Sequence, residues 1–187
     1  MATQKKSKRV YPWSEKLGTH TIAFELMKAE DRDRLLRFTQ SLPADDVMFL
    51  RKDITKTAVV DDWIDKIRQG STITVLANDE KHRIVGYASL HRDQLLWTRH
   101  LGEIRVVIAP ELRGIGLGKR LVHEMFQVGR QHKLQRIVVN MRRDQMPLQV
   151  MLERLGFKAE ALLTDWLMDA EGHTHDLLVM SCRLDDL

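Results

Sequence analysis

The sequence has little cysteine and no long hydrophobic run. Its single cysteine among 187 residues is Cys182, which cannot form an internal disulfide and offers too few ligands for a structural zinc site. No run of about 18 to 20 apolar residues could span a bilayer, and no apolar stretch follows the N-terminal charges as a secretory signal would require. These absences predict a reduced, cytoplasmic protein with no membrane span and no metal site.

The sequence also lacks a strong excess of either charge, because it has 30 Lys and Arg and 26 Asp and Glu, a net charge of +4. This mild excess does not predict a nucleic-acid partner. The exception is a basic stretch near the start of the chain, with Tyr11 and Trp13 beside it, which leaves an RNA contact as an alternative. We expect residues 1–18 to be a flexible basic tail and residues 19–187 to form one domain. The basic residues of the tail are Lys5, Lys6, Lys8, Arg9 and Lys16.

Hydrophobic periodicity predicts a mixed α/β domain. A helical period marks residues 29–42, 59–67, 115–132 and the segment from Pro147 to Gly156. Strand patterns mark residues 19–27, 71–77, 84–90, 101–109, 137–139, 161–168 and 175–182. The strands over 71–109 are expected to form an antiparallel meander. The strand, glycine loop, helix and strand that follow predict a crossover unit.

Three glycines alternate in the loop between a predicted strand and an amphipathic helix, at Gly114, Gly116 and Gly118. Without side chains in the way, backbone N–H groups can converge at the positive end of the helix dipole, which suits a phosphate or pyrophosphate. Arg120 stands where an ATPase loop needs Ser or Thr after Gly-Lys, so that loop is excluded. The glycine spacing also argues against a dinucleotide fold. The alternative is a tight connection with no ligand.

These residues resemble a known motif. Arg113, Gly116 and Gly118 stand at the fixed positions of Arg/Gln-x-x-Gly-x-Gly/Ala, the acetyl-CoA-binding pattern of the GNAT superfamily of N-acetyltransferases. A second family signature, Leu-Gly-Phe at a helix end, is matched by residues 155–157, and the order of elements agrees from about residue 21 to 183. The resemblance implies an α/β fold with a mixed, mostly antiparallel central sheet flanked by helices. It implies acetyl-CoA as co-substrate, so that residues 19–187 would be a single N-acetyltransferase domain.

The resemblance also implies roles for individual residues. The strand residues expected to contact the pantetheine arm are Val106, Val107 and Ile108. The residues expected to hold the pyrophosphate are Arg113, Gly114, Ile115, Gly116, Leu117, Gly118 and Lys119. A backbone N–H near Val107 would stabilise the tetrahedral oxyanion.

Acyl transfer to an amine requires a base, because an alkyl ammonium of pKa about 10.4 is almost fully protonated near neutral pH. Glu103 is the candidate, directly or through a water, since many members keep an acidic base at this place in the strand. The alternative is a carboxylate paired with Arg105 on the same strand face. The family's usual proton-donating tyrosine is replaced by Leu152, whose helical spacing indicates core packing. Tyr87 and Cys182 are candidate substitutes or, alternatively, core residues.

The sequence thus predicts an acetyl-CoA-dependent N-acetyltransferase in which a primary amine attacks the thioester directly. The acceptor stays open between a protein lysine, a protein N-terminus and a small-molecule amine, and a homodimer is left open. The alternative is a non-catalytic module of this fold that senses acyl-CoA or binds a partner. Specificity is expected in the loops over residues 43–57 and 91–100, with Trp97 as a wall of the acceptor site.

Overall fold

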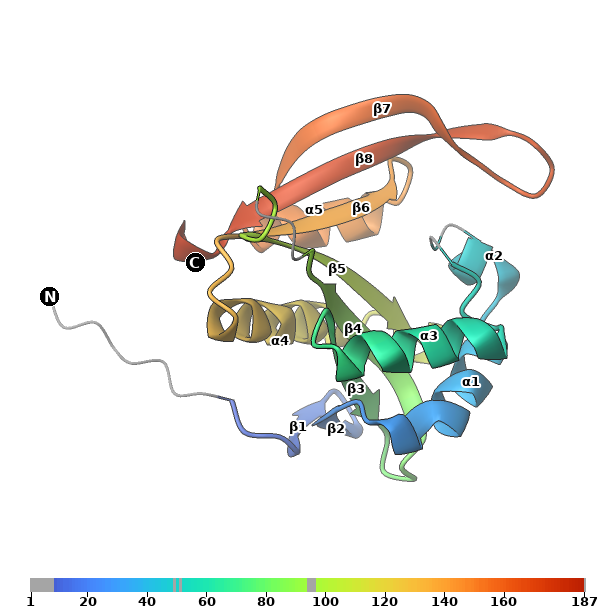
Figure 1. Cartoon of the computed structure of the whole chain (residues 1–187). Helices are drawn as coiled ribbons and strands as arrows, with labels where there is room; N and C mark the ends of the chain where they lie inside the picture. The colour runs from blue at the N-terminus through green and yellow to red at the C-terminus, as the bar shows by residue number, and fades with distance from the viewer. Residues whose placement is uncertain (1–8, 49, 51, 94–96, 187) are drawn as a thin grey trace, which may run out of the picture.

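Eight strands pair into one sheet in the part of the chain that the computed structural model describes, residues 9–48, 50, 52–93 and 97–186 (Figure 1). Lys5, Lys6 and Lys8 of the expected tail lie outside the described residues. The strands are β1 Trp13–Leu17, β2 His20–Leu26, β3 Thr72–Asn78, β4 Ile84–His91, β5 Leu101–Ile108, β6 Arg136–Arg142, β7 Lys158–Met168 and β8 Thr174–Arg183. The α-helices are α1 Arg32–Gln40, α2 Ala44–Met48, α3 Thr57–Arg68, α4 Leu117–Gln131 and α5 Met146–Arg154.

The strand order is β1-β2-β3-β4-β5-β6-β8-β7. Every neighbouring pair is antiparallel except β5 and β6, which run parallel because helix α4 forms the crossover between them. This confirms the expected mixed, mostly antiparallel sheet flanked by helices. The meander of β3, β4 and β5 and the crossover unit were both predicted.

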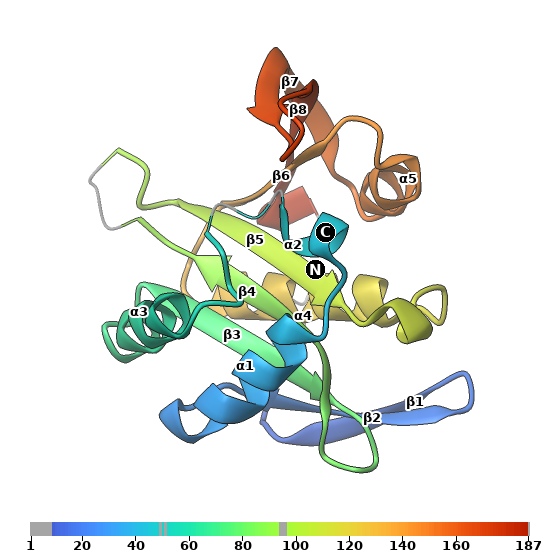
Figure 2. The same ribbon diagram turned by 90° about the vertical axis from the view of Figure 1, so that its right-hand side faces the viewer.

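Helices cover both faces of the sheet (Figure 2). On one face α3 packs on β3 and β4, with the Trp63 ring 4.9 Å from that of Tyr87. On the opposite face α4 lies across β4 and β5, where a methyl group added at Gly86 would contact Leu121. Alternation along β5 therefore divides its side chains, with Glu103, Arg105 and Val107 on the α3 face.

A strand lies inside the segment expected to be a tail, since residues 13–17 form β1 and pair with β2. The Trp13 ring stacks on Phe24 at 4.7 Å, and the guanidinium groups of Arg9 and Arg120 lie over the same indole ring. Tyr11 donates a 2.6 Å hydrogen bond to Glu124, a fully buried carboxylate of α4. These aromatic rings are used in packing rather than displayed for stacking on RNA bases.

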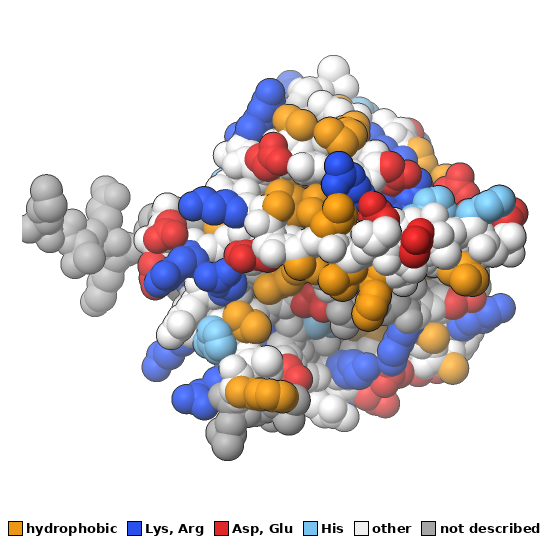
Figure 3. Space-filling view, turned by 90° about the horizontal axis from the view of Figure 1, so that it is seen from above, with side chains coloured by type: hydrophobic (Ala, Val, Ile, Leu, Met, Phe, Trp, Pro, Cys, Tyr) orange, Lys and Arg blue, Asp and Glu red, His pale blue; other side chains and the backbone are white. Residues whose placement is uncertain are grey.

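The hairpin of β7 and β8 extends beyond the helices at the edge of the sheet (Figure 1). Seen from that side, hydrophobic side chains lie among charged ones (Figure 3). The large exposed apolar residues on β7 are Leu162, Trp166 and Met168. None of the helices in the described residues is long and apolar enough to cross a membrane.

Candidate active site

The glycine loop connects β5 to α4 in a conformation that needs glycine at two positions. Gly114 and Gly116 have φ of +82° and +92°, in the left-handed region that L side chains rarely adopt. A methyl group at either would contact nothing within 4 Å, so the loop surface is open. At Gly118 a methyl group would lie 3.1 Å from Ile108, so close packing of α4 on β5 explains the third glycine.

The open loop exposes the first turn of α4, whose N–H groups have no acceptor within the helix. Of the predicted pyrophosphate residues, Leu117 is buried, so only its backbone faces the loop surface. Lys119 is exposed at the same turn. The Arg113 guanidinium lies 3.4 Å from the Ile108 carbonyl oxygen and forms an ion pair with Asp46 of α2. An anion at the helix start would thus meet backbone N–H groups and two cationic side chains.

Strands β5 and β6 separate after three paired positions. The parallel register joins Leu101, Gly102 and Glu103 to residues 136–138 and stops there, while β5 stays paired with β4 as far as Ile108. One edge of β5 from Ile104 to Ile108 therefore faces a fork rather than a neighbouring strand. Backbone groups on that edge are available to a ligand.

The direction of each backbone group along the fork follows from one hydrogen bond. The Ala109 N–H donates to the Val85 carbonyl, so alternation directs the N–H and C=O of Val107 toward β4 as well. The corresponding groups of Val106 and Ile108 point into the fork. A ligand backbone contact on β5 therefore falls on Val106 and Ile108, whereas Val107 contributes a buried side chain.

These features fit acetyl-CoA. The glycine loop and the start of α4 would hold the pyrophosphate, and the open edge of β5 would hydrogen-bond the amide groups of the pantetheine arm. Because the fork closes at Glu103, the acetyl end of an arm lying along β5 would approach that residue. Bound there, acetyl-CoA would supply an activated acetyl thioester.

Glu103 and Arg105 lie together on the α3 face, as the alternation predicted, with an Arg105 guanidinium nitrogen 3.3 Å from a Glu103 carboxylate oxygen. Both side chains line a pocket of about 240 Å³ beside the fork. The carboxylate retains 20% exposure, so it is accessible from the pocket. A carboxylate here can accept a proton from an amine that enters the pocket.

The other pocket walls come from the segment between α2 and α3, from α3 and from β4. They comprise Leu50, Lys52, Ile54, Val59, Asp62, Trp63, Lys66, Tyr87, Ser89 and His91. Residues 50, 52, 54 and 91 lie in the loops over 43–57 and 91–100 where specificity was expected, whereas the walls from α3 were not foreseen. Trp63 on α3 is buried and also borders the pocket, which the helical period over residues 59–67 does not reveal. Trp97, expected as a wall of the acceptor site, is 80% exposed and lies outside the lining of this pocket, so its role stays a prediction.

Leu152 is 1% exposed and packs in the core, so no proton donor stands at the family's tyrosine position. Of the two substitutes, Cys182 is buried beside Ile137, on the α4 side of the sheet. Tyr87 lines the pocket and lies opposite Val107 in the register of β4 and β5. Burial raises the pKa of the Tyr87 phenol above its ordinary value, which keeps its proton in place at neutral pH.

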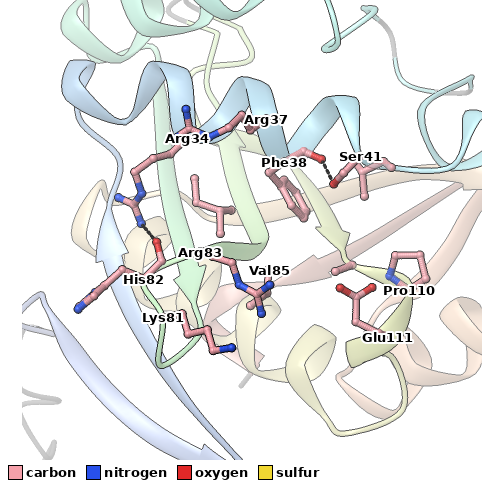
Figure 4. A pocket seen from close by; sticks show the side chains of 13 residues that line it. Arg34, Arg37, Phe38, Ser41, Lys81, His82, Arg83, Val85, Pro110 and Glu111 are labelled. Atoms are coloured by element: carbon pink, nitrogen blue, oxygen red, sulfur yellow. Dashed lines mark hydrogen bonds between the residues drawn. The ribbon is translucent and has the colours of Figure 1, made fainter.

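A second cavity, of about 620 Å³, lies between α1 and the turn joining β3 to β4 (Figure 4). Its cationic lining includes Arg34, which pairs with Glu25 and Asp31, and Arg83, which pairs with Asp79, together with Arg37 and Lys81. Figure 4 also shows Arg34 reaching the carbonyl oxygen of His82. Glu103 is not part of this lining, so the cavity lies apart from the candidate base.

Known proteins match both the sequence and the fold. Residues 35–157, about two thirds of the chain, match the model of the acetyltransferase (GNAT) family. A glucosamine 6-phosphate N-acetyltransferase from Trypanosoma brucei brucei is 33% identical over 96 residues, which are 49% of this chain. The chain spans 63% of that relative's length, less than two thirds.

Solved structures share the fold at lower identity. A ribosomal-protein-S5-alanine acetyltransferase from Vibrio fischeri has a TM-score of 0.76 and 17% identity, over 93% of this chain and 98% of the other. A phosphinothricin acetyltransferase from Sinorhizobium meliloti, solved in complex with acetyl-CoA, has a TM-score of 0.73 and 20% identity, over 86% and 88%. The family match confirms the expected family, and the two solved structures confirm its fold. The chain therefore belongs to the acetyltransferase (GNAT) family of N-acetyltransferases.

Proposed function

We propose that this protein transfers the acetyl group of acetyl-CoA to a primary amine that enters the pocket beside Glu103. The observation that carries the proposal is the meeting of the fork and the pocket at one residue. Pairing of β5 with β6 ends at Glu103, and the same side chain lines the pocket on the α3 face. A donor held along the open edge of β5 and an acceptor in the pocket would thus come together at this carboxylate.

In the proposed reaction the acceptor ammonium gives a proton to the Glu103 carboxylate, directly or through a water. The neutral amine nitrogen then attacks the carbonyl carbon of the thioester, so that a C–N bond forms and the C–S bond breaks. An N–H of the fork edge, from Val106 or Ile108, would stabilise the oxyanion between these events. Coenzyme A leaves as the thiolate, which is a tolerable leaving group. The second proton of the attacking nitrogen then passes to this thiolate, directly, through a water or by relay through Tyr87, so that the products are the neutral amide and the thiol.

The acceptor is an amine small enough for a pocket of about 240 Å³, either a small molecule or a single side chain or chain end of a protein. The Trypanosoma relative acts on glucosamine 6-phosphate by its name, and this makes an amino sugar phosphate a reasonable first acceptor to assay. The proposal places the reaction in the cytoplasm, where the buried thiol of Cys182 stays reduced.

The first test separates donor binding from turnover. Calorimetric titration of acetyl-CoA into the wild type should give micromolar binding, and Gly116→Glu should abolish it because the new carboxylate repels the pyrophosphate. CoA release with a panel of amines then measures turnover. Glu103→Gln should lower kcat by about 10²-fold or more while the Kd for acetyl-CoA is unchanged. Glu111→Gln, an exposed carboxylate after the same strand, is the matched control.

The rival, a non-catalytic module of the same fold, is favoured by one observation, the core position of Leu152. It requires acetyl-CoA binding with no CoA release in the presence of any amine. A wild-type rate in Glu103→Gln would instead reject this residue as the base. Tyr87→Phe tests the proton donor, with Cys182→Ala as a control on the opposite side of the sheet.

A further inference from the structure

The mouth of the acceptor pocket holds two ammonium groups that share one carboxylate oxygen. Lys52, in the segment after α2, and Lys66, on α3, place their Nζ atoms 2.5 and 3.0 Å from Oδ2 of Asp62. One carboxylate neutralises one of these two charges. Each ammonium has three N–H donors, so donor capacity remains for another acceptor.

The charged side chains of the pocket lining carry an excess of one positive charge. Three of them are cations, Lys52, Lys66 and Arg105, and two are carboxylates, Asp62 and Glu103. Arg105 is paired with Glu103, so the excess belongs to the lysine pair.

The charges are arranged along the depth of the pocket. The side chains of Lys52 and Lys66 are 49% and 39% exposed, at the mouth, whereas those of Glu103 and Arg105 are about 20% exposed. The lining also includes the buried apolar side chains of Trp63 and Ile54. The pocket thus presents a carboxylate at its inner end and surplus ammonium donors at its mouth.

We propose that the acceptor amine carries an acidic group, a carboxylate or a phosphate, whose oxygens bind Lys52 and Lys66 while the amine faces Glu103. This inference rests on the proposed function, since it names the substrate class of the same pocket. Anionic oxygens accept from ammonium groups more strongly than neutral ones do. A polyamine would bring further positive charge to the lysine pair and is disfavoured.

The test uses matched pairs of amines that differ only in the acidic group. Phosphoethanolamine with ethanolamine, and glucosamine 6-phosphate with glucosamine, test phosphate; β-alanine with β-alaninamide tests carboxylate. The acidic member of at least one pair should have kcat/KM about tenfold or more higher, the size of a charge-assisted hydrogen bond. The pair that shows the difference identifies which acidic group is recognised. Equal kcat/KM within every pair would overturn the inference and leave the proposed function standing.

Substitution of the two lysines tests whether they cause the preference for acidic amines. Lys52→Gln with Lys66→Gln should raise KM for the acidic member about tenfold or more, and should raise KM for the neutral member much less. Lys56→Gln, on the same segment but outside the pocket lining, is the matched control and should change neither. A loss shared equally by acidic and neutral amines would mean that the lysines only support the fold, against the inference.

Direct binding decides the case in which no amine of these pairs is acetylated, a result that leaves the proposed function open to other acceptors. Calorimetry of glucosamine 6-phosphate and phosphoethanolamine against their neutral partners is then the readout. Tighter binding of an acidic member, lost in the double lysine variant, would support the inference even so. Equal binding within the pairs, or none, would overturn it.

Discussion

Asp46 of α2 is bound to Arg113 of the glycine loop, with a carboxylate oxygen 2.5 Å from a guanidinium nitrogen. The Asp46 carboxylate thus occupies the guanidinium group that we expect to bind the pyrophosphate of acetyl-CoA. The chain continues from α2 into Leu50 and Lys52, which line the acceptor pocket. The donor loop and the acceptor wall are therefore joined through one ion pair.

Asp46→Asn should tighten acetyl-CoA binding, because the pyrophosphate would no longer compete with a carboxylate for Arg113. Since Arg113 is half exposed, the expected gain is modest, about two- to fivefold in Kd by calorimetry. Asp45→Asn, on the exposed side of the same helix, controls for the general loss of negative charge. Unchanged or weaker binding in Asp46→Asn would show that the pair does not compete with the ligand.

Gly116→Ala should destabilise the fold more than Gly118→Ala does. An alanine at φ +92° costs about 1 to 2 kcal/mol of backbone strain, although its methyl group would meet no neighbour. At Gly118 the strain is absent and the methyl group has only to displace the end of Ile108 by a few tenths of an ångström. Urea unfolding of the two variants measures the difference, and the opposite ranking would contradict the loop conformation described here.

Tyr11→Phe should lower the free energy of unfolding by about 1 to 3 kcal/mol, because the buried Glu124 carboxylate loses its 2.6 Å hydrogen bond. Burial of the Tyr11 phenol, and after it the hydrogen bond to Glu124, raises the pKa of Tyr11 above its ordinary value. Glu15→Gln is the comparison, since it breaks an ion pair with Arg120 that is partly exposed and should cost far less. Urea denaturation of all three proteins checks the order.

Asp169→Asn should remove a pH-dependent contribution to stability. A hydrogen bond from His175, together with N–H donors of the turn, lowers the pKa of Asp169 from 3.8 to about 2. A carboxylate with a depressed folded-state pKa stabilises the fold above pH 4, and this stabilisation is lost as the pH falls from about 4 to 2. Wild type and variant should therefore differ in Tm at pH 6 and converge toward pH 2. Equal Tm values of wild type and variant at pH 6 would contradict the prediction.

Local periodicity was sufficient to predict most of the fold and the arrangement of the site residues along β5. Period-two alternation on β5 placed Glu103 with Arg105, and it also determines that Val106 and Ile108, rather than Val107, direct backbone groups into the fork. Helical spacing likewise identified Leu152 as a core residue. These properties depend only on neighbours a few positions apart in the chain.

Other features depend on contacts between distant segments and left no local signal. Strand β1 lies in a charged segment and is held by Trp13 on Phe24 and Tyr11 on Glu124. Helix α2 has five residues and no buried side chain, so it has no hydrophobic period to detect. Lys66 reaches Asp62 at the i,i+4 spacing of one helix, but Lys52 joins them only through the turn of the chain before α3.

The three paired positions between β5 and β6 also have a mechanical meaning. At these positions β5 pairs with β6, which joins a larger block of strands β1 to β5 to a smaller block of β6, β8 and β7. Acetyl-CoA bound in the fork beyond these positions would hydrogen-bond to β5 of the larger block and keep the smaller block at a distance. Binding of acetyl-CoA would then determine the angle between the two blocks. That angle would in turn determine the distance from the Glu103 carboxylate to the acceptor amine.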